Sequence, residues 1–142
     1  ASCLLFVEAN KPVDVVWFRQ LKSRDGSIMH SGDNRTGAGD GDDEQISVSL
    51  NQVPANVKSI VFTVNSFTGQ SFAQVQNAYC RLVNANNGKE VARFDLSVQG
   101  PHSAQIMAKL SRHNGEWKMH ANGENGTGRT FDDLMPQITV HL

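Results

Sequence analysis

The residues with the most distinctive chemistry lie between Asp33 and Glu44. This stretch holds five carboxylates and one arginine, interleaved with three glycines and with two further oxygen donors, Asn34 and Thr36. Carboxylates this close repel one another, and the repulsion disfavours a compact loop unless a cation compensates it. Calcium can do so, because it accepts about six to eight oxygen ligands from carboxylates, carbonyls, amides and water. The stretch therefore predicts a calcium-binding loop.

The glycines and donor types of this loop narrow the choice of metal. Gly37, Gly39 and Gly41 let the backbone fold tightly and turn its carbonyl oxygens inward. Magnesium is a poorer candidate, because it demands a near-octahedral shell and keeps several waters. Zinc and copper also fit poorly, since the loop lacks the nitrogen and sulfur ligands that they favour.

Two known calcium motifs do not match the loop. An EF-hand register that starts at Asp33 places Glu44 at position twelve, but the glycine required at position six is Ala38. Residues 39–42 resemble the repeat of calcium-binding parallel β-helices, yet that motif needs stacked copies and occurs once here. A solvated acidic turn between two strands is the structural alternative to a metal site.

No catalytic arrangement accompanies the loop. The sequence has no Gly-x-Ser-x-Gly, no His-Glu-x-x-His and no phosphate-binding Gly-x-x-x-x-Gly-Lys. The histidines are predicted to lie on the surface or in hairpins. They are His30, His102, His113, His120 and His141. Asp132 and Asp133 are interpreted as partners of a short helix dipole and not as an acid and base pair.

The function predicted from these residues is that of a non-enzymatic binding or interaction module, with no catalytic residues. Two alternatives stay open at this point. One is a hydrolase that uses the loop metal as a Lewis acid, for which the sequence offers no base. The other is a β-sandwich that binds a small ligand or nucleotide, for which it offers no phosphate-binding motif.

Composition limits the class of protein. With 142 residues, 39% of them hydrophobic, the chain is expected to form one domain, residues 1–142. No run approaches the roughly 18 apolar residues of a membrane-spanning helix. The net charge of −1 gives no reason to expect a nucleic-acid partner. Cys3 and Cys80 lack the spacing of a zinc site or redox pair, so they are expected to be buried free thiols in a reducing compartment.

The elements that must position the loop have the composition of short strands. The predicted strands are rich in β-branched, aromatic or leucine side chains. They cover residues 13–18, 46–50, 59–64, 79–83, 90–96, 106–112 and 117–121, and the opening residues 4–7 are also strand-like. Asn-Gly at 87–88 and at 114–115 predicts two hairpins.

Helical signals are few. Apolar spacing allows a turn or two of helix over residues 72–79, and another turn is predicted at 131–135, ending at Pro136. Short strands with turn signals at regular intervals indicate an all-β fold, a two-sheet antiparallel β-sandwich with one or two short helices.

Residues 32–44 resemble the signature of the TerD family of tellurium-resistance and general stress proteins. Other blocks similar to that family lie before and after this segment, in the order in which the family has them, over nearly the whole chain. They are residues 21–27, 53–54, 71–79, 93–96 and 112–118. The resemblance implies a β-sandwich, calcium at the acidic loop, and a part in bacterial resistance to tellurite and other stresses.

The resemblance also implies a ligand set and partners. The implied calcium ligands are Asp33, Asn34, Thr36, Asp42, Asp43 and Glu44, with Asp40 at a position that the family varies more. The partners expected are calcium ions and other proteins of a stress or resistance complex, in the cytoplasm, with peripheral membrane association as an option. Family members usually carry a preceding segment with further carboxylates, so a truncated N-terminus and a weaker calcium site are expected here.

Overall fold

The structure is a computed structural model of the chain. It describes residues 2–8, 11–17, 20–31, 45–65, 79–84, 88–95, 104–113, 116–126 and 131–140, and every structural statement refers to these residues. They contain nine strands and three short helical segments. The strands are β1 (Ser2–Glu8), β2 (Lys11–Val16), β3 (Ile28–His30), β4 (Ile46–Val48), β5 (Ser59–Asn65), β6 (Tyr79–Asn84), β7 (Lys89–Asp95), β8 (Ala104–His113) and β9 (Glu116–Gly126). The helical segments are η1 (Leu50–Gln52), η4 (Phe131–Leu134) and α1 (Met135–Val140).

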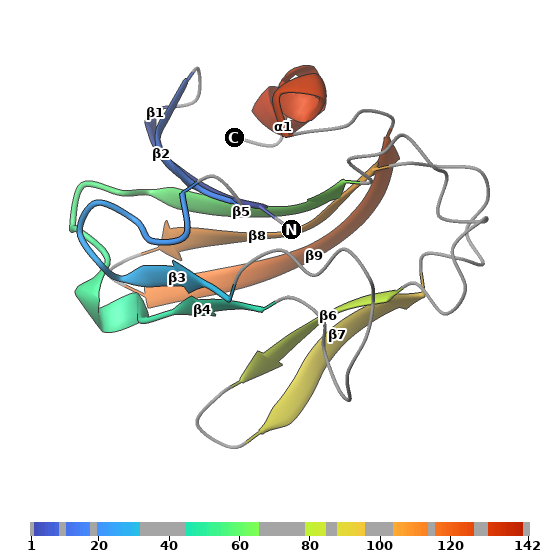
Figure 1. Cartoon of the computed structure of the whole chain (residues 1–142), viewed down its shortest axis with the longest axis horizontal. Coiled ribbons are helices and arrows are strands. Elements are labelled where there is room, and N and C mark those ends of the chain that lie inside the picture. The colour runs from blue at the N-terminus through green and yellow to red at the C-terminus, as the bar shows by residue number, and fades with distance from the viewer. Residues whose placement is uncertain are drawn as a thin grey trace. The chain divides into compact units, whose positions relative to one another are not determined.

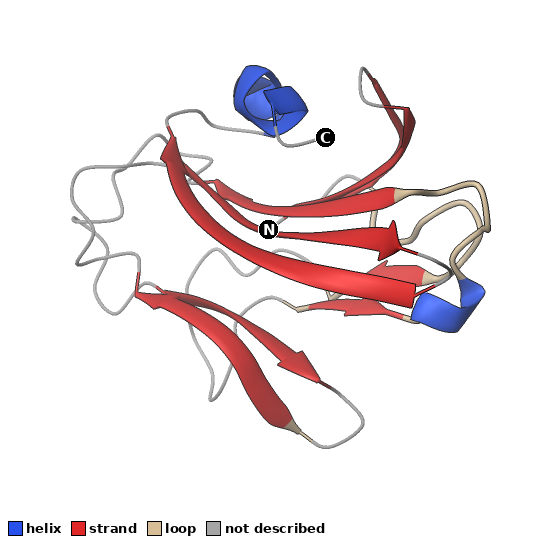
Figure 2. Cartoon of the chain, turned by 180° about the vertical axis from the view of Figure 1, so that it is seen from behind, coloured by secondary structure: helices blue, strands red, loops and turns tan. Residues whose placement is uncertain are grey.

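The strands form one larger sheet and two pairs (Figure 1). The larger sheet has the order β2-β1-β5-β8-β9, and the pairs are β3-β4 and β6-β7. The pairings of β1 with β2, β3 with β4 and β6 with β7 are antiparallel. Figure 2 shows how little of the described chain is helical. The predicted all-β class, with antiparallel strands and short helices, is confirmed. No helix in the described ranges is long and apolar enough to cross a membrane.

The chain divides into two compact units. The first comprises residues 1–62, 109–119 and 142, and the second comprises residues 63–108 and 120–141. Strand β1 supplies the centre of the first unit's core, since Cys3, Leu4, Leu5 and Phe6 are each at most 1% exposed. A continuous apolar run of this kind suits a strand that has both faces covered.

Cys3 is a free, fully buried thiol. Burial, together with the nearby charge of Asp14, raises the pKa of this thiol far above its usual value. The predicted buried free thiol is therefore confirmed for Cys3, and it is an unreactive one. The side chain of Cys80 lies outside those that the structure describes.

In the second unit, the first half of β8 is buried from Ala104 to Ala108. Helix α1 and the preceding η4 add Leu134 and Ile138, which are fully buried. The Gln137 side chain donates hydrogen bonds to the Glu124 carboxylate at 3.3 Å and to the Asn125 carbonyl oxygen at 3.2 Å. The end of β9 is thereby joined to α1.

The helical turn predicted at residues 131–135 is present, but its predicted end at Pro136 is wrong. Segment η4 is followed directly by α1, which runs through Pro136 to Val140. Proline is tolerated in the first turn of a helix, because the N–H that it lacks has no intrahelical acceptor there and its φ already suits the helix. Pro136 therefore lies at the start of α1.

Both Asn-Gly sites join neighbouring strands. Strands β6 and β7 pair antiparallel, and Gly88 in their connection has a φ of 70°, which glycine adopts without strain. Strands β8 and β9 are hydrogen-bonded neighbours joined by residues 114–115, which themselves lie outside the described residues. A connection this short can join only antiparallel strands. The two predicted hairpins are confirmed.

Candidate functional site

The acidic loop joins strands β3 and β4. These strands pair with the register Ile28↔Val48, Met29↔Ser47 and His30↔Ile46, and the next residues continue the pairing. The backbone N–H of Ser31 donates to the carbonyl oxygen of Gln45 at 2.8 Å, and the backbone N–H of Gln45 donates to the Ser31 hydroxyl at 2.8 Å. We call this pair, Ser31 and Gln45, the neck of the loop. The two residues that flank the segment 32–44 are therefore hydrogen-bonded to each other.

The predicted ligands themselves lie outside the described residues. They are Asp33, Asn34, Thr36, Asp40, Asp42, Asp43 and Glu44, and their arrangement about an ion stays a prediction. Within the described ranges, no three His, Cys, Asp or Glu side chains lie close enough to hold a metal ion. A site with three such side chains would therefore have to include at least one residue whose side chain the structure does not describe.

The donor set of the loop fits calcium. Its side chains offer carboxylate, amide and hydroxyl oxygens, and its glycines leave room for backbone carbonyls. A closed neck suits such a site, because ligands from one segment with fixed ends converge at a smaller cost in chain entropy than ligands from free segments. The donor chemistry of residues 33–44 is therefore compatible with a hard divalent cation.

Strand β3 is hydrogen-bonded on both sides. On the side away from β4, the backbone N–H of His30 donates to the Leu21 carbonyl oxygen at 2.7 Å, and that of Ser23 donates to the Ile28 carbonyl oxygen at 2.9 Å. Lys22 and Met29 form a bridge between these two contacts. The strand that enters the loop is thus anchored to the segment 20–23 as well as to β4.

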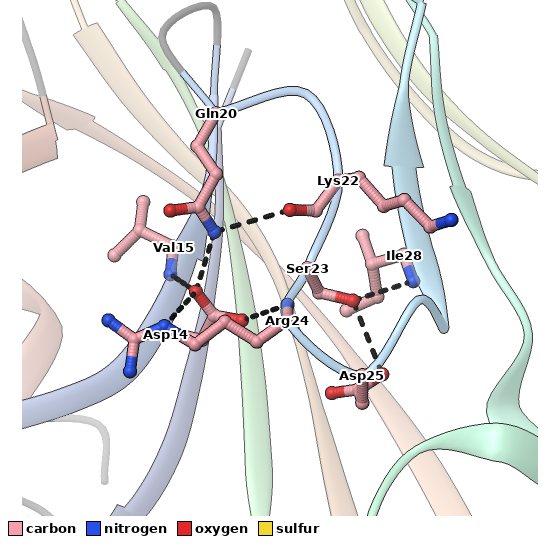
Figure 3. A network of polar contacts seen from close by, with 8 residues as sticks. All are labelled: Asp14, Val15, Gln20, Lys22, Ser23, Arg24, Asp25 and Ile28. Carbon is pink, nitrogen blue, oxygen red and sulfur yellow. Dashed lines mark hydrogen bonds and ion pairs between the residues drawn. The ribbon is translucent and has the colours of Figure 1, made fainter.

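The segment 20–24 is in turn held by the carboxylate of Asp14 on β2 (Figure 3). One oxygen of Asp14 accepts a hydrogen bond from the Gln20 side-chain amide at 2.7 Å, and the other accepts one from the Arg24 backbone N–H at 2.7 Å. The Val15 backbone N–H also donates to this carboxylate at 2.9 Å. The Asp14 side chain is only 8% exposed, so these donors replace most of its water.

The turn between segment 20–23 and β3 is built around Asp25 (Figure 3). Its carboxylate accepts hydrogen bonds from the Ser27 backbone N–H at 2.7 Å and from the Ser23 hydroxyl at 3.2 Å. Gly26 has a φ of 83°, a conformation that favours glycine. Partial burial acts to raise the pKa of Asp25, but the hydrogen bonds from Ser27 and Ser23 outweigh burial and hold the pKa below its ordinary value.

His30 does not lie on the surface, contrary to the sequence-based prediction. It is 6% exposed, because His30 and Ile28 point to the same, buried face of β3 while Met29 points to the other. His120 is exposed, as predicted. The side chains of His102, His113 and His141 lie outside those that the structure describes.

Sequence reasoning missed the supports of the loop, namely Asp14, Ser31 and Gln45. Asp25-Gly26 with a following serine is a turn signal that points to the turn before β3. Nothing in the spacing of Asp14 predicts its contact with residues 20–24, because that contact depends on how β2 lies against the segment. The neck depends in the same way on the β3–β4 register.

The chain is similar to tellurium-resistance and general stress proteins. It is 50% identical over 138 residues to tellurium resistance protein TerZ of Serratia marcescens, covering 97% of this chain and 71% of that protein. It is 46% identical to tellurium resistance protein TerD of the same organism, covering 81% of this chain and 62% of that protein. General stress protein 16U of Bacillus subtilis is 43% identical, with 89% of this chain and 70% of that protein covered.

Solved structures share the fold. A crystal structure of SAV2460, a protein of unknown function, has a TM-score of 0.81 and 25% identity, covering 94% of this chain and 82% of that one. SCO6318, a homologue of the telluride resistance protein TerD from Streptomyces coelicolor, has a TM-score of 0.80 at 20% identity, covering 94% and 83%. The TerD domain model matches residues 1–137. This chain therefore belongs to the TerD family of tellurium-resistance and general stress proteins.

Proposed function

We propose that this chain is a calcium-binding stress-response protein of the tellurium-resistance type, and that it binds the ion through the acidic loop 33–44. The single observation that carries the proposal is the concentration of five carboxylates in one glycine-rich segment between Ser31 and Gln45, which are hydrogen-bonded to each other at the neck. Because Ser31 and Gln45 hold the flanks of the segment together, a cation bound between the carboxylates would offset the repulsion among them.

Each loop residue has a defined part in this proposal. Asp42, Asp43 and Glu44 supply adjacent carboxylates next to the Gln45 side of the neck, and Asp33 supplies one close to the Ser31 side. Asn34 and Thr36 add neutral oxygens, and Asp40 adds a further carboxylate. A bound calcium ion supplies the positive charge that offsets these groups and thereby favours one conformation of the loop.

We further propose a non-enzymatic role, in which the calcium-loaded loop presents a binding surface to other proteins of a stress or resistance system in the cytoplasm. The names of the relatives reported above concern tellurium resistance and general stress, and none is the name of an enzyme. The chain spans 62% of its TerD relative and 71% of its TerZ relative. The roles in the names of those whole proteins therefore support the proposed role of this chain without establishing it.

Isothermal titration with calcium tests the proposal. The protein is first stripped of metal with a chelator, and the wild type is compared with Asp42→Ala/Asp43→Ala. The matched control is Asp132→Ala/Asp133→Ala, which removes the same two charges from an exposed pair in η4. We expect the loop variant to lose most of the calcium heat and the control to keep it. Equal calcium heats from the wild type and the loop variant would show that the loop is not the site.

A further inference from the structure

The neck of the acidic loop departs from a regular antiparallel ladder. In such a ladder every second facing pair exchanges two backbone hydrogen bonds. Ser27 and Ser49 face each other at the far end of the β3–β4 pair, and there the Ser49 N–H donates to the Ser27 carbonyl oxygen at 2.8 Å. Ser31 and Gln45 occupy the equivalent position four residues along β3. At the neck the Gln45 N–H donates to the Ser31 hydroxyl instead.

This exchange of acceptor lets the chain leave the ladder without losing the bond. A serine hydroxyl sits on a short side chain and can accept a backbone hydrogen bond that the carbonyl of the same residue would otherwise take. The main chain at Ser31 is then able to turn into the loop while Gln45 stays attached. Alanine at this position has no atom that could do the same.

The Ser31 side of the neck is held by the rest of the first unit. Ser31 follows β3, which is hydrogen-bonded to Leu21 and Ser23 on one side and to β4 on the other. Gln45 precedes β4, whose one strand partner among the described residues is β3, and in β4 Ile46 is half-buried and Ser47 is exposed. The hydrogen bond from the Gln45 N–H to the Ser31 hydroxyl therefore attaches Gln45 to the end of β3. Gln45 directly follows Glu44, a proposed calcium ligand.

We propose that Ser31 is a positioning residue for calcium, because its hydroxyl accepts one of the two hydrogen bonds that close the neck and thereby fixes Gln45, which follows the proposed ligand Glu44, next to the end of β3. The inference rests on the calcium binding proposed above. Ordering the loop around an ion costs conformational entropy, and an end that is already fixed lowers that cost. Removal of the hydroxyl should therefore weaken calcium binding although Ser31 need not touch the ion.

Three variants separate this role from a general effect on stability. Ser31→Ala removes the acceptor, Ser31→Thr keeps a hydroxyl, and Ser47→Ala removes the same atom from an exposed serine on β4. Calcium affinity is measured by titration, and thermal unfolding is measured in chelator. We expect Ser31→Ala to bind calcium about threefold to tenfold more weakly, the effect of one ordinary hydrogen bond. Ser31→Thr and Ser47→Ala should match the wild type.

Amide hydrogen exchange gives a readout that needs no metal. In chelator, the Gln45 amide should exchange faster in Ser31→Ala than in the wild type and in Ser47→Ala, since its acceptor is gone. Wild-type calcium affinity in Ser31→Ala overturns the inference and leaves the proposed function intact. Equal weakening by Ser47→Ala also overturns it. Absence of calcium binding by the wild type overturns the proposed function and, with it, this inference.

Discussion

Asp25 shows at the scale of one residue how hydrogen bonds to a charged group are linked to stability. The Ser27 N–H and the Ser23 hydroxyl donate to its carboxylate and, against the opposing effect of burial, hold its pKa below the ordinary value. The unfolded chain therefore binds the proton more readily than the folded one. The charge of Asp25 contributes stability above the unfolded pKa of about 3.9, and this contribution is lost as pH falls through the lower folded value.

We expect Asp25→Asn to unfold at a lower temperature than the wild type at about pH 6, and the difference to shrink as pH falls below about 4. Asparagine keeps an oxygen that can accept the Ser27 bond, so the variant isolates the contribution of the charge. Circular dichroism melts in chelator, at several pH values, measure the difference. A gap in melting temperature that is constant across this range would contradict the expectation.

Arg112 joins several backbone carbonyls of the first unit. Its Nε donates to the Val57 carbonyl oxygen at 2.8 Å, and its Nη2 donates to those of Val53 and Pro54 at 3.1 Å each. The guanidinium also lies 4.1 Å from the ring centroid of Trp117. A guanidinium has the planar, forked geometry for these contacts, and an ammonium group does not.

Arg112→Lys should therefore lower the free energy of unfolding by about 1 to 2 kcal/mol, since most of these hydrogen bonds would be lost. The same substitution at Arg24, whose side chain is 82% exposed and 4.0 Å from Asp14, is the matched control. We expect a change close to zero there, because the Arg24 side chain is exposed and a lysine keeps the positive charge. Urea unfolding of both variants checks the comparison, and an equal loss in the two would count against the role given to Arg112.

At the scale of elements, the attachment of α1 to β9 depends on a glycine. A Cβ at Gly126 would lie 2.6 Å from Cδ2 of Leu134 and 2.7 Å from Oε1 of Gln137. Leu134 is fully buried, so it cannot move aside without disturbing its neighbours. The close approach of η4 and α1 to the end of β9 thus requires a residue without a side chain.

We expect Gly126→Ala to destabilise the protein by about 1 to 3 kcal/mol, as overpacking of a buried contact usually does. In a Leu134→Ala background the same substitution should cost less, because the nearest clashing atom has been removed. A double-mutant cycle from denaturant unfolding measures this coupling. Strictly additive effects would indicate that the clash is not the reason for glycine at this position.

The elements differ in how far the sequence predicts them. The Asn-Gly hairpins were predictable because both residues tolerate the backbone conformation of a tight turn. Strand β3 was not predicted, since Ile28, Met29 and His30 are too few to show a period. The predicted strand 46–50 includes Leu50, but Leu50 begins η1. Of the helix predicted over residues 72–79, residues 72–78 lie outside the described residues, and Tyr79 begins β6.

At the scale of the whole molecule, the sequence identifies the chemistry of the candidate site more readily than its supports. The residue types of segment 33–44 are enough to show that its side chains offer oxygen donors, which calcium prefers, so calcium ligands can be proposed there from the sequence alone. Ser31 and Gln45 acquire a role only once the β3–β4 register brings them together. Asp14 acquires one only once β2 lies against the segment 20–24. Long-range pairing, which no local pattern records, decides both.

The central claim is that the loop 33–44 holds a calcium ion, and long-wavelength anomalous diffraction tests it most directly. Crystals of the wild-type protein are grown with calcium in excess, and the anomalous difference map is inspected around these residues. We expect a peak surrounded by carboxylate, amide and carbonyl oxygens at about 2.3 to 2.6 Å. A well-ordered loop without such a peak, its carboxylates directed into solvent, would contradict the claim.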